Sequence, residues 1–198
     1  MAKRTVDVIL ATLGLLFCLP LFAAIWLVLT FADPGTVFFR QRRVGQHGRL
    51  FEIIKFRTMS THAEGNGPSI TISGDQRVTR IGRALRKTKL DELPQLWNVL
   101  RGEMSLVGPR PELPQFVALY TPEQRAVLAL KPGITDEASL IYRNEEQLLA
   151  AASDPGQFYI QHCIPQKIAL NLAYARHASV RSDLVIILRT VMAVWIKG

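Results

Sequence analysis

Two adjacent carboxylates, Asp91 and Glu92, follow the cations Arg86, Lys87 and Lys89 in a strongly basic stretch of the chain. Neighbouring side chains on a helix point about 100° apart, so this pair cannot flank a sugar ring from opposite sides as the carboxylates of glycosidases do. At a helix start, however, both can reach one metal ion or one phosphoryl group, because exposed N–H groups and the helix dipole favour anions there. The pattern predicts phosphate chemistry with Mg²⁺, in which Asp91 stays ionised, as a nucleophile must be.

The same stretch has a purely structural interpretation. Thr88 and Asp91 have the spacing of a helix-capping box, and acidic residues are common in the first turn of a helix. By this interpretation the two carboxylates stabilise the start of a helix and do no chemistry. Taken alone, the stretch fits capping at least as well as catalysis.

Several cations are candidates for holding a diphosphate. Arg86, Lys87, Arg110 and Arg143 are the main ones, since a guanidinium can make two parallel hydrogen bonds to phosphate oxygens. A solvated basic face, or attraction to anionic lipid headgroups, is the alternative for each of them.

Two short motifs add further candidates. Pro109 and Pro111 flank Arg110 and restrict the backbone, which predicts a fixed direction for that side chain; a merely structural turn is the alternative. Lys55 and Arg57 lie at the end of a predicted strand, and we interpret them as facing phosphate or supporting residues that do.

Composition sets the class of protein. The chain has 198 residues, 48% of them hydrophobic, which is enough for one domain with its own core. The net charge of +8 predicts an anionic partner, namely nucleic acid, an anionic membrane face or a phosphorylated substrate. The two cysteines, Cys18 and Cys163, lie far apart and indicate no disulfide framework, which fits a reducing, cytoplasmic location.

Other functional classes lack their sequence signals. The four histidines do not have metal-site spacing, and the chain contains neither a P-loop nor a dinucleotide-binding glycine fingerprint. No hydrolase nucleophile elbow is present. No helix-turn-helix or RNA-binding signature appears either, so we do not expect nucleic acid as a partner.

Residues 8–32 contain no charged side chain and exceed the roughly 20 residues that a membrane-spanning helix needs. The run is too long for a signal peptide and lacks a small-residue cleavage site. Pro20 interrupts its middle, and basic residues flank both ends, which places both ends on the cytoplasmic side. We therefore predict a re-entrant helix that bends at Pro20 and leaves by the face it entered. A simple spanning helix is the alternative.

The remaining pattern predicts an α+β fold that is associated with the membrane. Strands at 37–39 and 50–56 would form a small antiparallel sheet. A helix would begin at Asp91, present Leu93, Leu96, Trp97 and Leu100 on one face, and end at Gly102. The last helix, 184–196, is apolar and belongs either to the core or to the membrane interface. We divide the chain into a membrane helix with its flanks, residues 1–36, and a cytoplasmic catalytic domain with interfacial helices, residues 37–198.

Taken together, these segments resemble the bacterial sugar transferases that act as monotopic phosphoglycosyl transferases, in their minimal catalytic form. The resemblance covers nearly the whole chain, and the combination of its motifs is highly specific. The motifs are Lys3-Arg4 with Asp7, Phe39-x-Gln-x-Arg-x-Gly45, Lys55-Phe-Arg-Thr-Met59, Thr79-Arg-x-Gly82, Arg86-Lys87, Leu90-Asp-Glu-Leu-Pro-Gln-Leu96, Asn98-Val-Leu-x-Gly102, Met104-Ser-x-Val-Gly-Pro-Arg-Pro111, Lys131-Pro-Gly-Ile-Thr135 and Arg143-Asn144.

The resemblance implies a reaction and a place for it. Such enzymes move a sugar-1-phosphate from a nucleotide sugar, usually a UDP-sugar, to a polyprenyl phosphate such as undecaprenyl phosphate, for surface glycan synthesis. They work at the cytoplasmic face of the bacterial inner membrane. The dyad of the family falls on Asp91, which would attack phosphorus and form a covalent phosphosugar, and on Glu92. It further implies Mg²⁺ as cofactor, touched by Asp91.

By the same match, cations and prolines around the dyad take up the donor. Arg86, Arg110 and Arg143 would hold phosphates, and Pro109 and Pro111 would border the nucleotide.

This chain departs from the family pattern in two places. The family often has Ser-Pro at the helix bend, where this chain has Leu19-Pro20, and the missing hydroxyl can no longer satisfy a freed carbonyl. After Thr135, many members read Gly-x-x-Gln, but this chain reads Asp136-Glu-Ala-Ser139. We expect the second departure to affect the choice of sugar or nucleotide.

Two rival functions remain at this stage. A membrane-bound phosphoesterase would release the sugar phosphate to water without a lipid acceptor. A basic membrane-anchored binding protein would bind by charge and tolerate Asp91→Asn. The sequence names neither the sugar nor the polyprenol or pathway. It leaves open whether Glu92 acts as a base or as an orienting group, and whether the chain works as a monomer or a homodimer.

Overall fold

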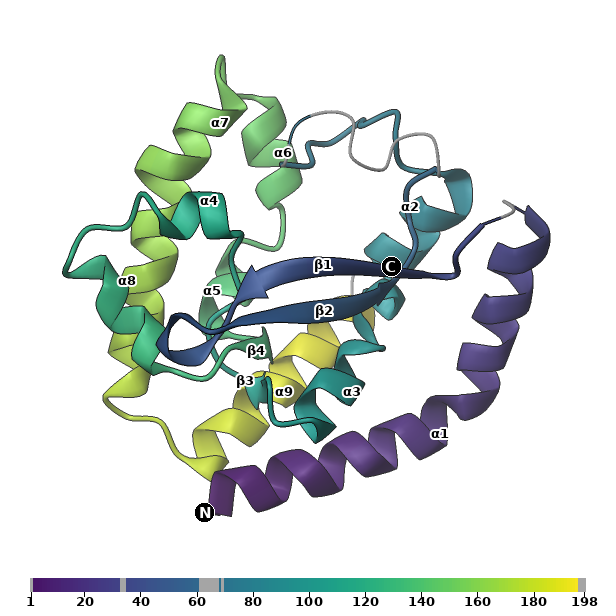
Figure 1. Ribbon diagram of the computed structural model, residues 1–198, viewed down its shortest axis with the longest axis horizontal. Coiled ribbons are helices and arrows are strands. Elements are labelled where there is room, and N and C mark those ends of the chain that lie inside the picture. The colour runs from purple at the N-terminus through teal and green to yellow at the C-terminus, as the bar shows by residue number, and fades with distance from the viewer. Residues whose placement is uncertain (1, 33–34, 61–67, 69, 196–198) are drawn as a thin grey trace.

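A two-stranded antiparallel hairpin runs through the middle of the molecule, with short helices around it and one long helix along its side (Figure 1). The computed structural model describes residues 2–32, 35–60, 68 and 70–195, without the side chains of the last two. The mixture of helices with small sheets confirms the predicted α+β class.

The hairpin consists of β1, Phe38–Val44, and β2, Leu50–Phe56. Phe38 lies opposite Phe56 and Val44 opposite Leu50. The second strand matches its predicted range, whereas the first extends five residues beyond the predicted 37–39. Its extension carries three arginines and a glutamine, which obscured a strand whose side chains alternate in exposure.

A second, parallel pair was not predicted. It joins β3, Ser105–Val107, to β4, Gly133–Thr135. The backbones come so close here that a Cβ on Gly133 would lie 2.1 Å from the amide nitrogen of Gly108. The predicted antiparallel sheet of β1 and β2 is confirmed, and the parallel pair is a second, separate sheet that fixes the chain just before the turn at Pro109.

Helices supply most of the remaining structure. The α-helices are α1, Ala2–Ala32; α2, Arg80–Lys87; α3, Gln95–Leu100; α4, Pro114–Val117; α5, Glu137–Ile141; α6, Glu145–Ala150; α7, Pro155–Phe158; α8, Ile164–Ala175; and α9, Val180–Trp195. Shorter 3₁₀ and π turns are η1, Gln46–Gly48; η3, Leu90–Glu92; η4, Gln124–Ala129; and η5, Tyr159–Cys163.

Helix α1 is long and apolar enough to cross a membrane, and Pro20 lies within it. Its N-terminal part binds β3, since Asp7 accepts hydrogen bonds from Ser105 Oγ at 2.8 Å and from the Leu106 amide at 3.1 Å. Its C-terminal part packs Leu29 into the core cluster under β2 and α2. In Figure 1 the helix follows a curved path along the domain from α9 to α2. Both ends of α1 are thus attached to the same domain.

Two basic side chains strengthen the N-terminal attachment. Arg4 donates to the carbonyl oxygens of Val99 and Leu100, at the end of α3 where helix carbonyls lack partners within the helix. Lys3 donates to the carbonyl of Val107 and pairs with Asp183 of α9. The basic flank therefore binds the folded domain.

The middle of α1 is bare. Phe17 is 87% exposed, and only 11% of the most hydrophobic 18-residue window of α1 is buried. Apolar side chains of this size rarely stay in water as a continuous surface. The exposed segment contains Pro20, the residue at which a bend was predicted. The helix is curved, but no separate kink at Pro20 is shown.

The predicted apolar face of α9 is mostly outside the core. Leu184, Leu188 and Val191 are 47%, 60% and 50% exposed, while Ile186 is buried. On α3, Leu96 and Leu100 pack against a core cluster, and Trp97 is 52% exposed. The apolar face of α9 is therefore available to a partner outside the chain.

We predict that Gly133→Ala destabilises the fold by about 2 kcal/mol or more, because neither backbone at the β3–β4 contact can yield to a methyl group. Thermal unfolding followed by circular dichroism measures the change. Gly156→Ala is the matched control, since its added carbon meets only the Asp154 side chain, at 3.3 Å. Equal melting temperatures for both variants would contradict the tight contact.

Candidate active site

The dyad lies in η3, between α2 and α3, and not at the start of a longer helix as predicted. Asp91 and Glu92 are 6% and 7% exposed. Lys89 adopts a left-handed conformation with φ 55°, which breaks the chain direction after α2, and the next α-helix begins only at Gln95. The predicted end at Gly102 is confirmed by its positive φ of 81°.

The capping interpretation fails on this geometry. Thr88 ends α2 and its hydroxyl donates to the Ala84 carbonyl at 2.9 Å, so it does not cap a helix that begins near Asp91. The structure thus offers no capping role that would account for the two carboxylates.

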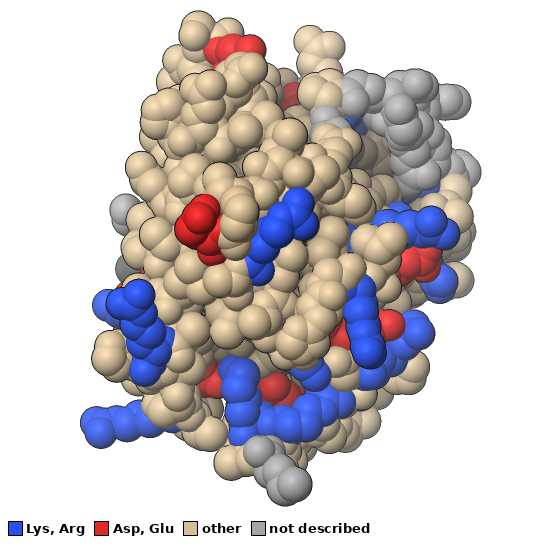
Figure 2. Space-filling model, turned by 60° about the vertical axis from the view of Figure 1, so that its left-hand side comes forward, with Lys and Arg blue, Asp and Glu red and all other residues tan. Residues whose placement is uncertain are grey.

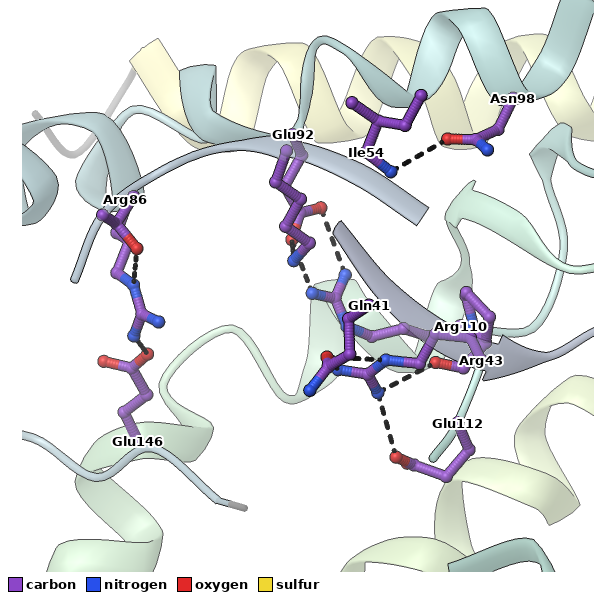
Figure 3. Close-up of polar contacts among 12 residues, drawn as sticks. Gln41, Arg43, Ile54, Arg86, Glu92, Asn98, Arg110, Glu112 and Glu146 are labelled. Carbon is purple, nitrogen blue, oxygen red and sulfur yellow. Dashed lines mark hydrogen bonds and ion pairs between the residues drawn. The ribbon is translucent and has the colours of Figure 1, made fainter. Parts of the chain in front are cut away.

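Glu92 is fully committed to cations. Its carboxylate accepts two hydrogen bonds from Arg110, at 3.1 and 2.5 Å, and one from Lys55 at 2.7 Å (Figure 3). Burial by itself would raise the pKa of Glu92, but the charges of Arg110 and Lys55 outweigh it and hold that pKa well below its ordinary value. Glu92 is therefore an ionised residue that positions two cations.

Asp91 is in the opposite situation. Burial, followed by the negative charge of Glu92, raises the pKa of Asp91, while Lys55 lowers it in part. Its Oδ1 is buried and has no hydrogen-bond partner within the part of the chain that the structure describes. The nearby cations, and not a helix N-terminus as expected, favour its ionised form. The two neighbouring carboxylates thus differ: Glu92 is bound by two cations, whereas Asp91 can still bind a ligand.

Both carboxylates open on a cavity of about 960 Å³, large enough for a nucleotide-sized ligand. Nine basic and seven acidic side chains line its wall, which gives it a small excess of positive charge. The basic ones are Arg43, Lys55, Arg83, Arg86, Lys87, Lys89, Arg110, Arg143 and Lys167. Such a wall suits a ligand with several negative charges.

Most predicted site residues meet at this cavity. The lining includes Lys55, Arg86, Asp91, Glu92, Pro109, Arg110, Pro111 and Arg143. Arg57 is not among them, because it is only 2% exposed and its amide donates to the Val37 carbonyl. Its long side chain is enclosed in the domain, so Arg57 does not face the cavity directly, and of its two predicted roles only that of a supporting residue stays open.

Two of the arginines are held by other parts of the wall. Arg86 donates through Nε to Thr58 Oγ1 and through Nη1 to Glu146 of α6, both at 3.0 Å, away from Glu92 (Figure 3). Arg143 donates to the carbonyl of Ala193 in α9 at 3.0 Å. A phosphate group would have to share or replace these contacts.

Sequence reasoning missed the residues that support the Pro-Arg-Pro turn. Arg43 of β1 donates to the Pro111 carbonyl at 3.2 Å and to the Glu112 carboxylate at 3.3 Å (Figure 3). Tyr159 of η5 donates to the same carboxylate. Two signals were available: Arg43 is the arginine of the motif Phe39-x-Gln-x-Arg-x-Gly45, although it was given no role of its own, and Glu112 directly follows the turn. This network ties the turn to the hairpin.

It also missed an amide on the cavity wall. Asn171 donates through Nδ2 to Asp136 at 2.8 Å and to the Lys167 carbonyl at 2.9 Å. Both amide hydrogens are thereby used, and Oδ1 is left buried without a partner among the described residues. Asp136 in turn caps α5 through the Ser139 amide at 2.6 Å. The stretch that departs from the family pattern therefore lies on the cavity wall.

The residues present fit a magnesium ion in one way. No group of three or more metal-binding side chains occurs among the described residues. Mg²⁺ commonly takes one or two carboxylate oxygens, with phosphate oxygens and water filling its remaining positions. The unpartnered Oδ1 of Asp91 can supply that single oxygen.

The comparisons with known proteins identify the class. Residues 1–197 match the family described as bacterial sugar transferase, and the chain belongs to that family. Two of the relatives named below, those of Aeromonas and Caulobacter, are named as transferases, and this chain is accordingly an enzyme of the transferase class.

Three relatives illustrate the family. UDP-N-acetylgalactosamine-undecaprenyl-phosphate N-acetylgalactosaminephosphotransferase of Aeromonas hydrophila is 34% identical over 97% of this chain and 43% of its own length. UDP-glucose:undecaprenyl-phosphate glucose-1-phosphate transferase of Caulobacter vibrioides is 39% identical over 96% of this chain and 68% of its own length. The exopolysaccharide production protein ExoY of Rhizobium meliloti is 35% identical over 98% of this chain and 85% of its own length. The chain thus spans less than half of the Aeromonas protein.

We predict a bell-shaped pH dependence of kcat/KM for the donor, which reports the free enzyme. If Asp91 is the nucleophile, as the sequence predicts, activity should fall as the pH drops through its raised pKa, because the protonated acid cannot attack phosphorus. Activity should also fall as the pH rises through about 8, the value to which burial lowers the pKa of Lys55.

Lys55→Arg should keep kcat/KM high to a more alkaline pH, since arginine stays charged there. Lys87→Arg, at an exposed lysine of the same wall, is the control and should leave the alkaline limb unchanged. An alkaline limb that moves equally in both variants would exclude Lys55 as its origin.

Proposed function

We propose that this enzyme transfers a sugar-1-phosphate from a UDP-sugar to undecaprenyl phosphate through a covalent intermediate on Asp91, for surface glycan synthesis. One observation carries the proposal. A buried aspartate oxygen that has no partner among the described residues lies beside a glutamate bound by two cations. Both face a cavity with an excess of positive charge, in a domain with an exposed apolar helix. The relatives of Aeromonas and Caulobacter carry a UDP-sugar and undecaprenyl phosphate in their names, which supports both substrates.

The first step is a displacement at phosphorus. A carboxylate oxygen of Asp91 attacks the phosphorus next to the sugar, and a P–O bond forms as the bond to the UMP oxygen breaks. UMP leaves with that electron pair, and the sugar phosphate stays on the aspartate. No proton has to move, which suits an ionised nucleophile in a cavity lined by cations.

The second step repeats the displacement with the lipid. An oxygen of undecaprenyl phosphate attacks the same phosphorus, the bond to Asp91 breaks, and the carboxylate is regenerated. The product is undecaprenyl diphosphate sugar. Splitting one displacement into two gives ping-pong kinetics.

Glu92 serves as an orienting group in this mechanism. Its pKa is held well below the ordinary value, so it is a weak base, and it anchors Arg110 and Lys55 at the cavity wall. Arg110 and Lys55 then face the phosphates with little freedom to move. Arg86 and Arg143 would reach the phosphates by giving up their present contacts, and Pro109 and Pro111 would border the nucleotide.

Mg²⁺, when bound with the donor, neutralises charge on the diphosphate. In this proposal Oδ1 of Asp91 is the oxygen that the protein would contribute to the magnesium ion. The cations of the wall orient the donor so that the second oxygen of Asp91 faces phosphorus.

We place the protein at the cytoplasmic face of the bacterial inner membrane, with α1 as a re-entrant helix bent at Pro20. Asp7 and Leu29, near opposite ends of α1, both contact the catalytic domain, and a helix that crossed the bilayer would carry one end away from it. The bare middle would enter the bilayer, and the exposed apolar face of α9 would lie at the interface. Basic side chains also gather toward the lower part of the face in Figure 2, where they can meet anionic headgroups.

We predict that Asp91→Asn lowers transfer by at least about 10³-fold, because an amide cannot form the phosphosugar adduct. Release of UMP from a UDP-sugar and trapping of a labelled sugar phosphate on the protein with donor alone measure the two steps. Loss of a buried carboxylate with a raised pKa should leave the melting temperature equal or higher.

Glu123→Gln, at a fully exposed carboxylate, is the control and should retain activity. Retained transfer in Asp91→Asn would reject the nucleophile assignment. Charge-dependent binding without any transfer, unchanged in Asp91→Asn, would instead indicate a protein that binds by charge alone. UMP release followed by free sugar phosphate, with no lipid-linked product, would instead indicate a phosphoesterase.

We also expect single cysteines placed by Ala2→Cys and Thr36→Cys, in a chain carrying Cys18→Ala and Cys163→Ala, to resist a membrane-impermeant thiol reagent in intact cells. Both positions lie at the ends of α1, and re-entry keeps both inside. Permeabilised cells are the control and should label at both. Labelling of one position in intact cells would show a spanning helix.

A further inference from the structure

A second, smaller groove lies between α5 and α9, with a volume of about 460 Å³. Its surface is mainly apolar, yet it carries two guanidinium groups and one carboxylate. Its lining consists of Glu137, Leu140, Ile141, Arg143, Arg189, Met192 and Ala193. None of the sequence motifs accounts for a groove of this character.

The groove adjoins the reaction cavity. Leu140, Arg143 and Ala193 line both spaces, so these three residues form the partition between them. The partition is held by the hydrogen bond of Arg143 to the Ala193 carbonyl, between two exposed groups. A ligand in the groove therefore lies one layer of side chains from the cavity that contains Asp91.

The other side of the groove meets the apolar face of α9. Met192 and Ile141 of the groove wall are 47% and 59% exposed, and Val185 and Leu188 continue the apolar surface along the helix. Arg189 follows Val185 by one helical turn and precedes Ala193 by another, so it stands at the margin between apolar face and groove. An arginine at such a margin can cover apolar surface with its stem while its head group stays polar.

Apolar walls with two arginines match an amphiphile whose head is an anion. A phosphate monoester on a hydrocarbon chain has this chemistry, since guanidinium groups bind phosphate oxygens in pairs and the chain prefers apolar side chains. Glu137 is the one carboxylate that lines the groove. Together with Arg143 and Arg189 it leaves the groove with a net positive charge.

We propose that the groove between α5 and α9 is the binding site of the polyprenyl phosphate acceptor, which rests on the proposed function. The isoprenoid lies against Ile141 and Met192, and the phosphate is received by Arg189. From there the phosphate passes Arg143, which releases Ala193, and enters the reaction cavity. The acceptor thus arrives from the membrane side without crossing the space that the nucleotide uses.

An anionic membrane lipid shares this headgroup chemistry. The proposal commits to the acceptor because the groove shares its wall with the reaction cavity, which a general headgroup contact would not need. The two sources are separated by working in neutral detergent without anionic lipid.

The test uses Arg189→Gln in the full chain, in neutral detergent with undecaprenyl phosphate and UDP-sugar. Arg189 lines the groove but not the reaction cavity. We expect KM for undecaprenyl phosphate to rise about tenfold. UMP release with donor alone, and KM for the donor, should stay at the wild-type values, because the first step needs no lipid. Arg181→Gln is the matched control, at another exposed arginine of α9 outside the groove, and should keep the wild-type acceptor KM.

Ile141→Asp adds a second variant at an exposed position and should also raise the acceptor KM alone. The proposal is overturned if acceptor KM is unchanged in Arg189→Gln, if Arg181→Gln raises it equally, or if donor-only UMP release falls in proportion. A wild-type enzyme that releases no UMP from donor alone would contradict the proposed function itself. A normal wild-type reaction with an unaltered Arg189→Gln variant would contradict the groove only.

Discussion

The ion pair between Glu92 and Arg110, joined by Lys55, is the contact on which the site depends. It brings together the turn after α2, the Pro-Arg-Pro turn and strand β2, which lie far apart in the sequence. Each partner is held by more than one hydrogen bond or by burial, so removing one would leave another charge unpaired inside the protein. Because Glu92 saturates these cations, Asp91 beside it keeps a buried oxygen free for a ligand.

Arg110 is held in place through β3, which connects its turn to helix α1. Asp7 of α1 binds β3 at Ser105, and β3 leads directly into the turn that contains Arg110. The close approach of Gly108 to Gly133 leaves this segment no room to shift. The apolar helix is thus part of the scaffold of the site and is more than an anchor. That arrangement fixes the cavity relative to the surface from which a lipid substrate would come.

Local sequence patterns predicted the features that depend on residues close together in the chain, namely the dyad, strand β2 and the apolar helix. They did not predict β3 and β4, because three residues are too short to show periodicity. The raised pKa of Asp91 also escaped prediction, since it depends on burial and on charges brought from elsewhere in the chain. Asn171 gave no signal, as its free oxygen exists only because Asp136 and a carbonyl occupy its amide group.

An enzyme that joins a water-soluble donor to a lipid has to bring both to one nucleophile. In a two-step displacement UMP leaves before the lipid attacks, so the two substrates need not fill the cavity together. They still need separate approaches, because the donor comes from water and the acceptor from the bilayer. The large basic cavity and the apolar groove beside it meet at a partition of three residues, one of which is Arg143. In the proposed mechanism, an arginine at that junction can bind the phosphate of whichever substrate is present, and the wall that the two spaces share would then set the order of exchange.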